Sequence, residues 1–164
     1  MSCTGPDVVT KIISGAQSGA DQAGLDAAVA LDLDRGGWIP LGRRTEDGRL
    51  SDELFTLWRL KEHPSSGWTG RTEQNIIDSD GTVIFGNPYT PGSSLTVRLC
   101  RLPKHKKPHL IMSLVDNDPT ELLKWILNHN IHTLNVAGNR ESVNPGIYQL
   151  THQTLMQAFR SNSL

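Results

Sequence analysis

The sequence predicts an α/β domain in which a parallel sheet lies between two layers of helices. Short apolar, strand-like segments alternate with helical patterns along the chain, which is typical of successive βαβ units. The strand-like segments are continuous apolar runs, as in Thr82-Val-Ile-Phe85, and such runs are typical of strands covered on both faces. Ligands of these folds bind beyond the carboxyl ends of the strands. The loops that follow the strands are therefore the first candidates for a functional site.

The apolar runs and turn residues define the expected elements. Strands are expected at residues 11–15, 36–40, 82–85, 108–112 and 133–137. Helices are expected at residues 21–31, 69–79, 93–102, 119–128 and 146–160, with Asp21 as the N-cap of the first. Residues 41–66 are polar and irregular in pattern, and a loop of this length in a compact domain is usually functional or mobile.

Length and composition restrict the class of protein. The 164 residues suit one domain, which we expect to span residues 11–160 after a short flexible tail at residues 1–10. A formal net charge of −1 gives no support to bulk nucleic-acid binding or to an anionic membrane surface. The chain shows neither a membrane-spanning run nor the pattern of a signal peptide. Its two cysteines, Cys3 and Cys100, form no disulfide framework, so we expect a cytoplasmic protein with Cys100 as a buried thiol.

The turn between the first strand and the first helix, SGAQSGAD at residues 14–21, is the most informative local feature. A glycine-containing turn that opens a helix directs backbone N–H groups and the positive helix end to one spot, which favours a phosphate. The turn is neither a Walker A loop nor a Gly-x-Gly-x-x-Gly motif, so an ordinary tight connection is the alternative. The residues that would hold the anion are Gly15, Gln17, Ser18, Gly19 and Asp21.

A second loop, at residues 86–92, also opens a helix. Its candidate anion-binding residues are Gly92, Ser93 and Ser94, with Thr96 one turn further along. Helix capping alone is the alternative for each serine, and Thr96 would then be an ordinary residue of a helix face.

A third loop, at residues 138–145, follows the last strand directly. Gly138 and Asn139 would lie at the strand end, and the planar guanidinium of Arg140 suits a phosphate or a carboxylate. Alternatively, Arg140 is a solvated surface group that the adjacent Glu141 neutralises.

Four further residues are candidates because of their position near these loops. Arg43 and Arg44, in the long polar segment, would close over an anionic ligand or remain solvated. Arg71 and Asn75 share one face of their helix at i, i+4 spacing, so both would face the same pocket or a charged helix surface.

Metal and nucleophile motifs are missing from the sequence. The six histidines are scattered, and the chain contains neither Cys-x-x-Cys nor His-Glu-x-x-His. It also lacks a Gly-x-Ser-x-Gly elbow. We therefore expect no directly ligated metal and assign no catalytic residue.

Long, ordered motifs resemble those of the circularly permuted SLOG family, whose members are often labelled molybdenum carriers. The matching segments are SGAQSGAD at 14–21, GGWIPLGRRTEDG at 36–48, RTEQNIIDSD at 71–80, LTV at 95–97 and LNVAGNRES at 134–142. The resemblance runs from about residue 11 to residue 159, which is nearly the whole chain.

The resemblance implies a circularly permuted Rossmann-like fold that binds a nucleotide or a related phosphorylated ligand. Non-permuted relatives, such as the Lonely Guy phosphoribohydrolases, open with a pattern that here stands near the end, GNR at 138–140 and PGIY at 145–148. Molybdenum cofactor, a pterin that bears a phosphate, fits this ligand class. Homo-oligomers are common in the wider superfamily, so one is expected here.

One departure from the family pattern bears on catalysis. The phosphoribohydrolases carry a glutamate where this sequence has Arg98, and a cation cannot act as a carboxylate base. The resulting hypothesis is a binding protein for a phosphorylated small ligand, with molybdenum cofactor as a candidate. The alternatives are a phosphoribohydrolase in which Asp21, Glu73 or Glu141 replaces the lost glutamate, and a degenerate nucleotide-sensing module.

Overall fold

A six-stranded parallel sheet forms the centre of the computed structural model, which describes residues 9–160. The order across the sheet is β5-β2-β1-β8-β6-β7, and every neighbouring pair is parallel. The strands are β1 (Lys11–Ile13), β2 (Asp34–Ile39), β5 (Leu60–Glu62), β6 (Gly81–Phe85), β7 (His109–Met112) and β8 (Thr133–Gly138). The expected α/β class is confirmed, and the last strand, β8, lies between β1 and β6 in the middle of the sheet.

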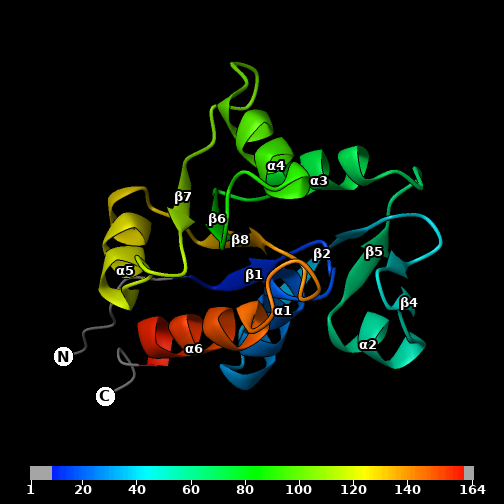
Figure 1. The fold of residues 1–164 in the computed structure, drawn as a ribbon, viewed down its shortest axis with the longest axis horizontal. Helices are drawn as coiled ribbons and strands as arrows, with labels where there is room; N and C mark the ends of the chain where they lie inside the picture. Colours follow the sequence, from blue (N-terminus) through cyan, green and yellow to red (C-terminus); the bar gives the residue numbers. More distant parts are fainter. Residues whose placement is uncertain (1–8, 161–164) are drawn as a thin grey trace.

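Helices cover both faces of the sheet (Figure 1). One face carries α1 (Ala20–Ala30), α5 (Pro119–Asn128) and α6 (Ile147–Arg160), and the other carries α3 (Trp68–Ile77) and α4 (Pro91–Arg101). Within residues 9–160, no helix has both the length and the apolar character needed to cross a membrane.

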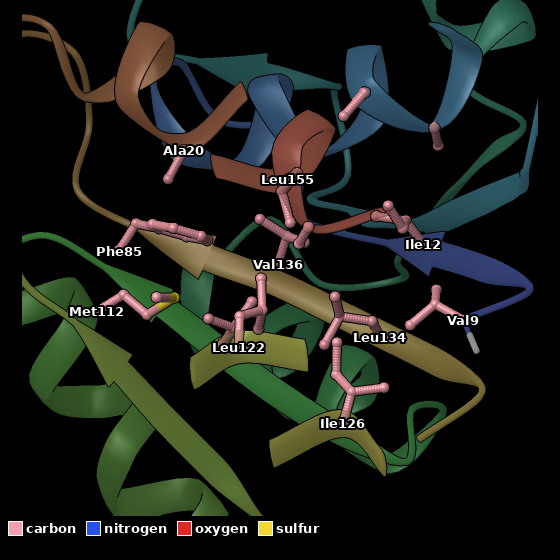
Figure 2. Packing of buried hydrophobic residues seen from close by; sticks show 14 of the residues in the cluster. Val9, Ile12, Ala20, Phe85, Met112, Leu122, Ile126, Leu134, Val136 and Leu155 are labelled. Carbon is pink, nitrogen blue, oxygen red and sulfur yellow. The ribbon is translucent and has the colours of Figure 1, made fainter. Parts of the chain in front are cut away.

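The main core lies between the sheet and the layer of α1, α5 and α6. Successive side chains of a strand point to opposite faces, so Leu134 and Val136 of β8 enter this core while Asn135 faces the α3 and α4 layer. Figure 2 shows Val136 between Leu122 of α5 and Leu155 of α6, with Leu134 next to Ile126 of α5. The α3 and α4 layer has a smaller cluster of Ile76, Leu99 and Cys100, and burial raises the pKa of the Cys100 thiol.

The segment at residues 41–66 is more regular than its composition predicts. It contains the hairpin of β3 (Arg44–Thr45) and β4 (Gly48–Arg49), the helix α2 (Asp52–Leu57) and the edge strand β5. Strand β5 has one buried apolar residue, Leu60, and it extends the sheet by pairing with β2. Leu60 joins Trp58 and Leu50 in a second buried cluster, so long-range packing organises a segment that local sequence describes only as polar.

Ordered contacts extend two residues before the expected start of the domain. Val9 is buried in the main core, and the N–H of Thr10 donates to the carbonyl of His132 at 2.8 Å. The rest of the expected tail, residues 1–8 with Cys3, lies outside the described residues.

Candidate functional site

A pocket of about 480 Å³ lies at the carboxyl ends of β1 and β8, beneath α3 and α4. This volume is typical of small-molecule sites. The predicted residues that line it are Gly15, Gln17, Asp21, Arg71, Asn75, Gly92, Ser93, Thr96, Gly138, Asn139 and Arg140. The three loops singled out in the sequence therefore converge on one cavity, as expected for strand ends in an open α/β sheet.

Hydrogen bonds within the protein already use most backbone N–H groups of the loop between β1 and α1. The N–H of Gln17 donates to Asp21 Oδ2 at 3.2 Å, that of Ser18 to Gln17 Oε1 at 3.0 Å, and that of Ala20 to the carbonyl of Asn139 at 3.2 Å. The N-cap of α1 is Gly19, which corrects the assignment of Asp21 to that position. Asp21 lies in the first turn of the helix, and its carboxylate sits where the sequence suggested a bound anion.

A buried ion pair joins α1 to α3. Arg71 Nη1 lies 3.5 Å from Asp21 Oδ2, and both side chains are about nine-tenths buried. Burial raises the pKa of Asp21 and lowers that of Arg71, while the attraction between the two charges opposes both shifts. The guanidinium passes so close to Gly15 that a Cβ there would be 1.3 Å from Nη1.

Gly15→Ala is therefore expected to displace Arg71 from Asp21. Crowding of this kind in a packed interior typically costs about 1–3 kcal/mol of unfolding free energy. Urea denaturation measures the loss, and Gly92→Ala is the matched control because, among residues 9–160, a Cβ at that position would contact no atom within 4 Å beyond its own helix and chain neighbours. Equal stability of the two variants would contradict the packing argument.

Two buried donors in the pocket wall have no acceptor in the described part of the chain. The side-chain oxygen of Gln17 accepts from the N–H groups of Ser18 and Glu46, at 3.0 and 2.7 Å, which fixes the orientation of the amide. Among residues 9–160, its Nε2 is buried without a hydrogen-bond partner, and so is Nε of Arg71. Because buried donors are nearly always satisfied, both groups need an acceptor that this part of the chain does not supply.

Asn139 builds the second loop around the start of α4. Its Nδ2 donates to the carbonyl of Asn87 at 3.0 Å and to the hydroxyls of Thr90 and Ser93, both at 3.2 Å. Its Oδ1 accepts the N–H of Asn87 at 2.7 Å. Helix α4 begins in the pocket, and its N-cap, Thr90, makes no side-chain capping bond. The first-turn N–H groups of α4 therefore lie at the pocket with the positive end of the helix.

Three guanidinium groups surround the indole of Trp68 at the first position of α3. The guanidinium carbons of Arg44, Arg71 and Arg140 lie 5.1, 5.3 and 5.3 Å from a ring centroid of this side chain. Arg44 also donates to the carbonyl of Ser66 at 2.7 Å. Within residues 9–160, the carbonyl of Arg140 accepts the N–H groups of Val143 and Asn144 at 3.2 and 3.0 Å, but its side chain has neither a hydrogen bond nor an ion pair. The nearby charge of this guanidinium lowers the pKa of Arg71.

Five predicted site residues lie outside the pocket lining: Ser18, Gly19, Arg43, Arg44 and Ser94. Arg43 forms ion pairs with Asp52 at 2.7 Å and Glu62 at 3.4 Å, so it anchors the 41–66 segment. A Cβ on Gly19 would lie 2.4 Å from the carbonyl oxygen of Asn139, so this glycine permits the first and third loops to pack together. Asn75 lines the pocket, but its amide bonds the backbone N–H and carbonyl of Trp38.

Glu46 is a structural residue that sequence reasoning missed. Its side chain accepts hydrogen bonds from Ser18 and from the N–H and hydroxyl of Ser142, which links three loops. Partial burial opposes ionisation of Glu46, but these hydrogen bonds outweigh it and lower its pKa. Trp68 was also missed, because a single tryptophan before a polar helix carries no signal of a pocket wall. In residues 9–160, no group of three or more His, Cys, Asp or Glu side chains could hold a metal ion.

The comparisons with known proteins agree with the motifs. A model of the circularly permutated YpsA SLOG family matches residues 12–159. The chain belongs to this family. A crystal structure at 1.45 Å resolution of a "putative molybdenum carrier protein" from Syntrophus aciditrophicus SB is 39% identical, with a TM-score of 0.82. The match covers 93% of this chain and 95% of that chain.

The remaining comparisons contribute no evidence on the ligand. No curated protein matches the sequence. The structure of (E)-4-hydroxy-3-methyl-but-2-enyl diphosphate reductase aligns with a TM-score of 0.36 at 11% identity, over 91% of this chain and 59% of that one. A likeness this distant supports no argument.

Proposed function

We propose that this SLOG protein binds a phosphorylated, nucleotide-like small ligand, with the phosphate at the start of α4. The observation that carries the proposal is Arg140, which lines the pocket without an ion pair among residues 9–160. The carboxylate in the lining, Asp21, is already paired with Arg71, so the charged side chains that line the pocket, Asp21, Arg71 and Arg140, sum to a net positive charge. The N-terminus of α4 adds backbone N–H groups and a favourable dipole for the same anion.

Molybdenum cofactor has the chemistry that this pocket would accept. It is a pterin that bears a phosphate, and the name of the 39% identical protein is that of a molybdenum carrier. In this proposal, Arg140 and the start of α4 hold the phosphate, and the metal itself is cargo.

Binding is favoured over phosphoribohydrolase activity because the candidate carboxylates have other partners. Glu73 lies 2.7 Å from His105 Nε2 and 3.1 Å from Lys104 Nζ. Glu141 accepts hydrogen bonds from backbone N–H groups at the start of α6, and Asp21 is held by Arg71. Arg98, at the position of the phosphoribohydrolase glutamate, is exposed and outside the pocket lining.

Arg140→Ala is expected to weaken binding of nucleoside monophosphates by about tenfold or more, because a hydrogen bond to a charged group contributes about 1.5–3 kcal/mol. Isothermal titration calorimetry with guanosine monophosphate (GMP) and adenosine monophosphate (AMP) measures the change. Arg98→Ala is the matched control, since this exposed arginine of α4 lies outside the pocket lining. Unchanged affinity in Arg140→Ala, or wild-type protein that binds no phosphorylated probe, would overturn the proposed function.

A further inference from the structure

We infer that the Asp21 end of the pocket recognises the edge shared by guanine and pterins, in which a ring N–H lies between an amino group and a carbonyl. This inference rests on the proposed function and specifies its ligand class. It concerns Gln17, Asp21 and Arg71, whereas the phosphate proposal depends on Arg140 and the start of α4. The two can therefore fail separately.

Fixed hydrogen-bond donors form one half of the recognition surface. The oxygen of the Gln17 side chain is occupied by two backbone N–H groups, so Nε2 must remain the group without a partner. Arg71 Nη1 donates to Asp21, while Arg71 Nε is buried and has no partner within residues 9–160. Both residues line the pocket. Donors held in this way require an acceptor on the ligand, and the carbonyl oxygen of the proposed edge is one.

The carboxylate of Asp21 forms the other half. Oδ2 accepts from the N–H of Gln17 and from Arg71 Nη1, at 3.2 and 3.5 Å. No hydrogen bond to Oδ1 is formed among residues 9–160, and Asp21 lines the pocket. An acceptor beside fixed donors matches a neutral part of a ligand that carries both hydrogen-bond donors and an acceptor. The ring N–H and amino group of guanine or a pterin would donate to Oδ1, and the neighbouring carbonyl would accept from Gln17 or Arg71.

The same atoms disfavour two other groups at this end of the pocket, a phosphate and an adenine ring. A phosphate here would face the carboxylate of Asp21, which offsets the attraction of Arg71 for an anion, whereas Arg140 and the start of α4 have no carboxylate paired with them. Adenine presents an amino group where guanine has its carbonyl, and an acceptor nitrogen where guanine has its ring N–H. Donors would then face a donor, and the carboxylate would face an acceptor.

Titration calorimetry of the full chain with GMP, inosine monophosphate and AMP tests the inference. GMP is expected to bind at least about tenfold more tightly than AMP, because buried groups left without partners discriminate strongly. Inosine monophosphate lacks only the amino group and should fall between the two. Neopterin monophosphate distinguishes the ligand sources: tighter binding than GMP indicates a pterin ligand, and weaker binding indicates a guanine nucleotide. Either result supports recognition of the shared edge.

Asp21→Asn provides a specificity switch. The amide oxygen would take the place of Oδ2, because two donors point there, and Nδ2 would then face the ligand in place of Oδ1. Xanthosine monophosphate has a carbonyl where GMP has its amino group. The variant is therefore expected to prefer xanthosine monophosphate to GMP by about tenfold, the reverse of the wild-type order. The ratio is measured within one protein, so a general loss of stability does not produce it.

Gln17→Glu provides the second variant. It keeps the side-chain oxygen that holds the turn and replaces the free donor by an acceptor, so GMP affinity should fall by about tenfold or more. Equal affinities for GMP and AMP in the wild type would overturn the inference and leave the phosphate proposal intact. An unchanged nucleotide order in Asp21→Asn would also overturn it, and absence of binding by every phosphorylated probe would overturn both proposals.

Discussion

Arg71→Met should destabilise the protein by about 3–5 kcal/mol at pH 7, the usual cost of removing one partner of a buried ion pair. Asp21 would remain buried at the end of the pocket without the guanidinium that now lies 3.5 Å from it. Methionine approximates the length of the arginine stem, so the lost charge rather than a large cavity would dominate. Urea denaturation followed by circular dichroism measures the change in unfolding free energy.

The pH dependence of this variant identifies Asp21 as the cause. Burial already raises the pKa of Asp21 above its ordinary value of 3.8, and removing Arg71 removes the attraction that opposes this rise. The folded state then binds more protons than the unfolded state between the two pKa values. Stability of Arg71→Met should therefore increase as the pH is lowered from 7 toward 4.

A double variant provides the control for that assignment. Arg71→Met combined with Asp21→Asn has no buried charge at this position, so it should be more stable than Arg71→Met alone at pH 7. It should also lose most of the additional pH dependence. If Arg71→Met unfolded at the wild-type urea concentration and with the wild-type pH profile, the ion pair would have no role in stability.

Local sequence patterns predicted the fold wherever strands are apolar over their whole length. Strand β6 is the clearest example, since Thr82-Val-Ile-Phe85 is buried throughout. Strand β5 could not be predicted, because Leu60-Lys-Glu62 has one apolar residue and depends on pairing with β2 and on the cluster around Trp58. An edge strand of this kind is determined by distant contacts rather than by its own propensity.

The location of the pocket could be predicted, but the partners of its polar groups could not. Strand ends identify where loops gather, and hence Gln17, Asp21 and Arg140 were found. The sequence does not show that Asp21 accepts the backbone N–H of Gln17, or that Glu46 reaches Ser142 across 96 positions of the chain. Hydrogen bonds of this kind decide which predicted site residues face the pocket and which hold the loops together.

Asn139→Ala is expected to cost about 2–4 kcal/mol of unfolding free energy, because the Asn139 side chain is buried and several hydrogen bonds would be lost together. It should also weaken GMP binding by about tenfold or more. Without Asn139, the backbone of Asn87 and the hydroxyl of Ser93 lose their shared partner, so the start of α4 is no longer held beside Arg140. Urea denaturation and titration calorimetry measure the two effects.

Asn87→Ala tests whether the loss comes from the hydrogen bonds of Asn139 or would follow any substitution in the loop at residues 86–92. Asn87 is exposed, and its side chain accepts a hydrogen bond from the N–H of Tyr89 at 2.9 Å, whereas Asn139 bonds only its backbone. The substitution therefore leaves the contacts of Asn139 in place and should change stability and affinity little. If Asn87→Ala lost as much as Asn139→Ala, the loop would depend on its own turn rather than on β8. A large loss in Asn139→Ala alone would mean that the residue directly after the central strand β8 positions the start of α4, where the proposed function places the phosphate.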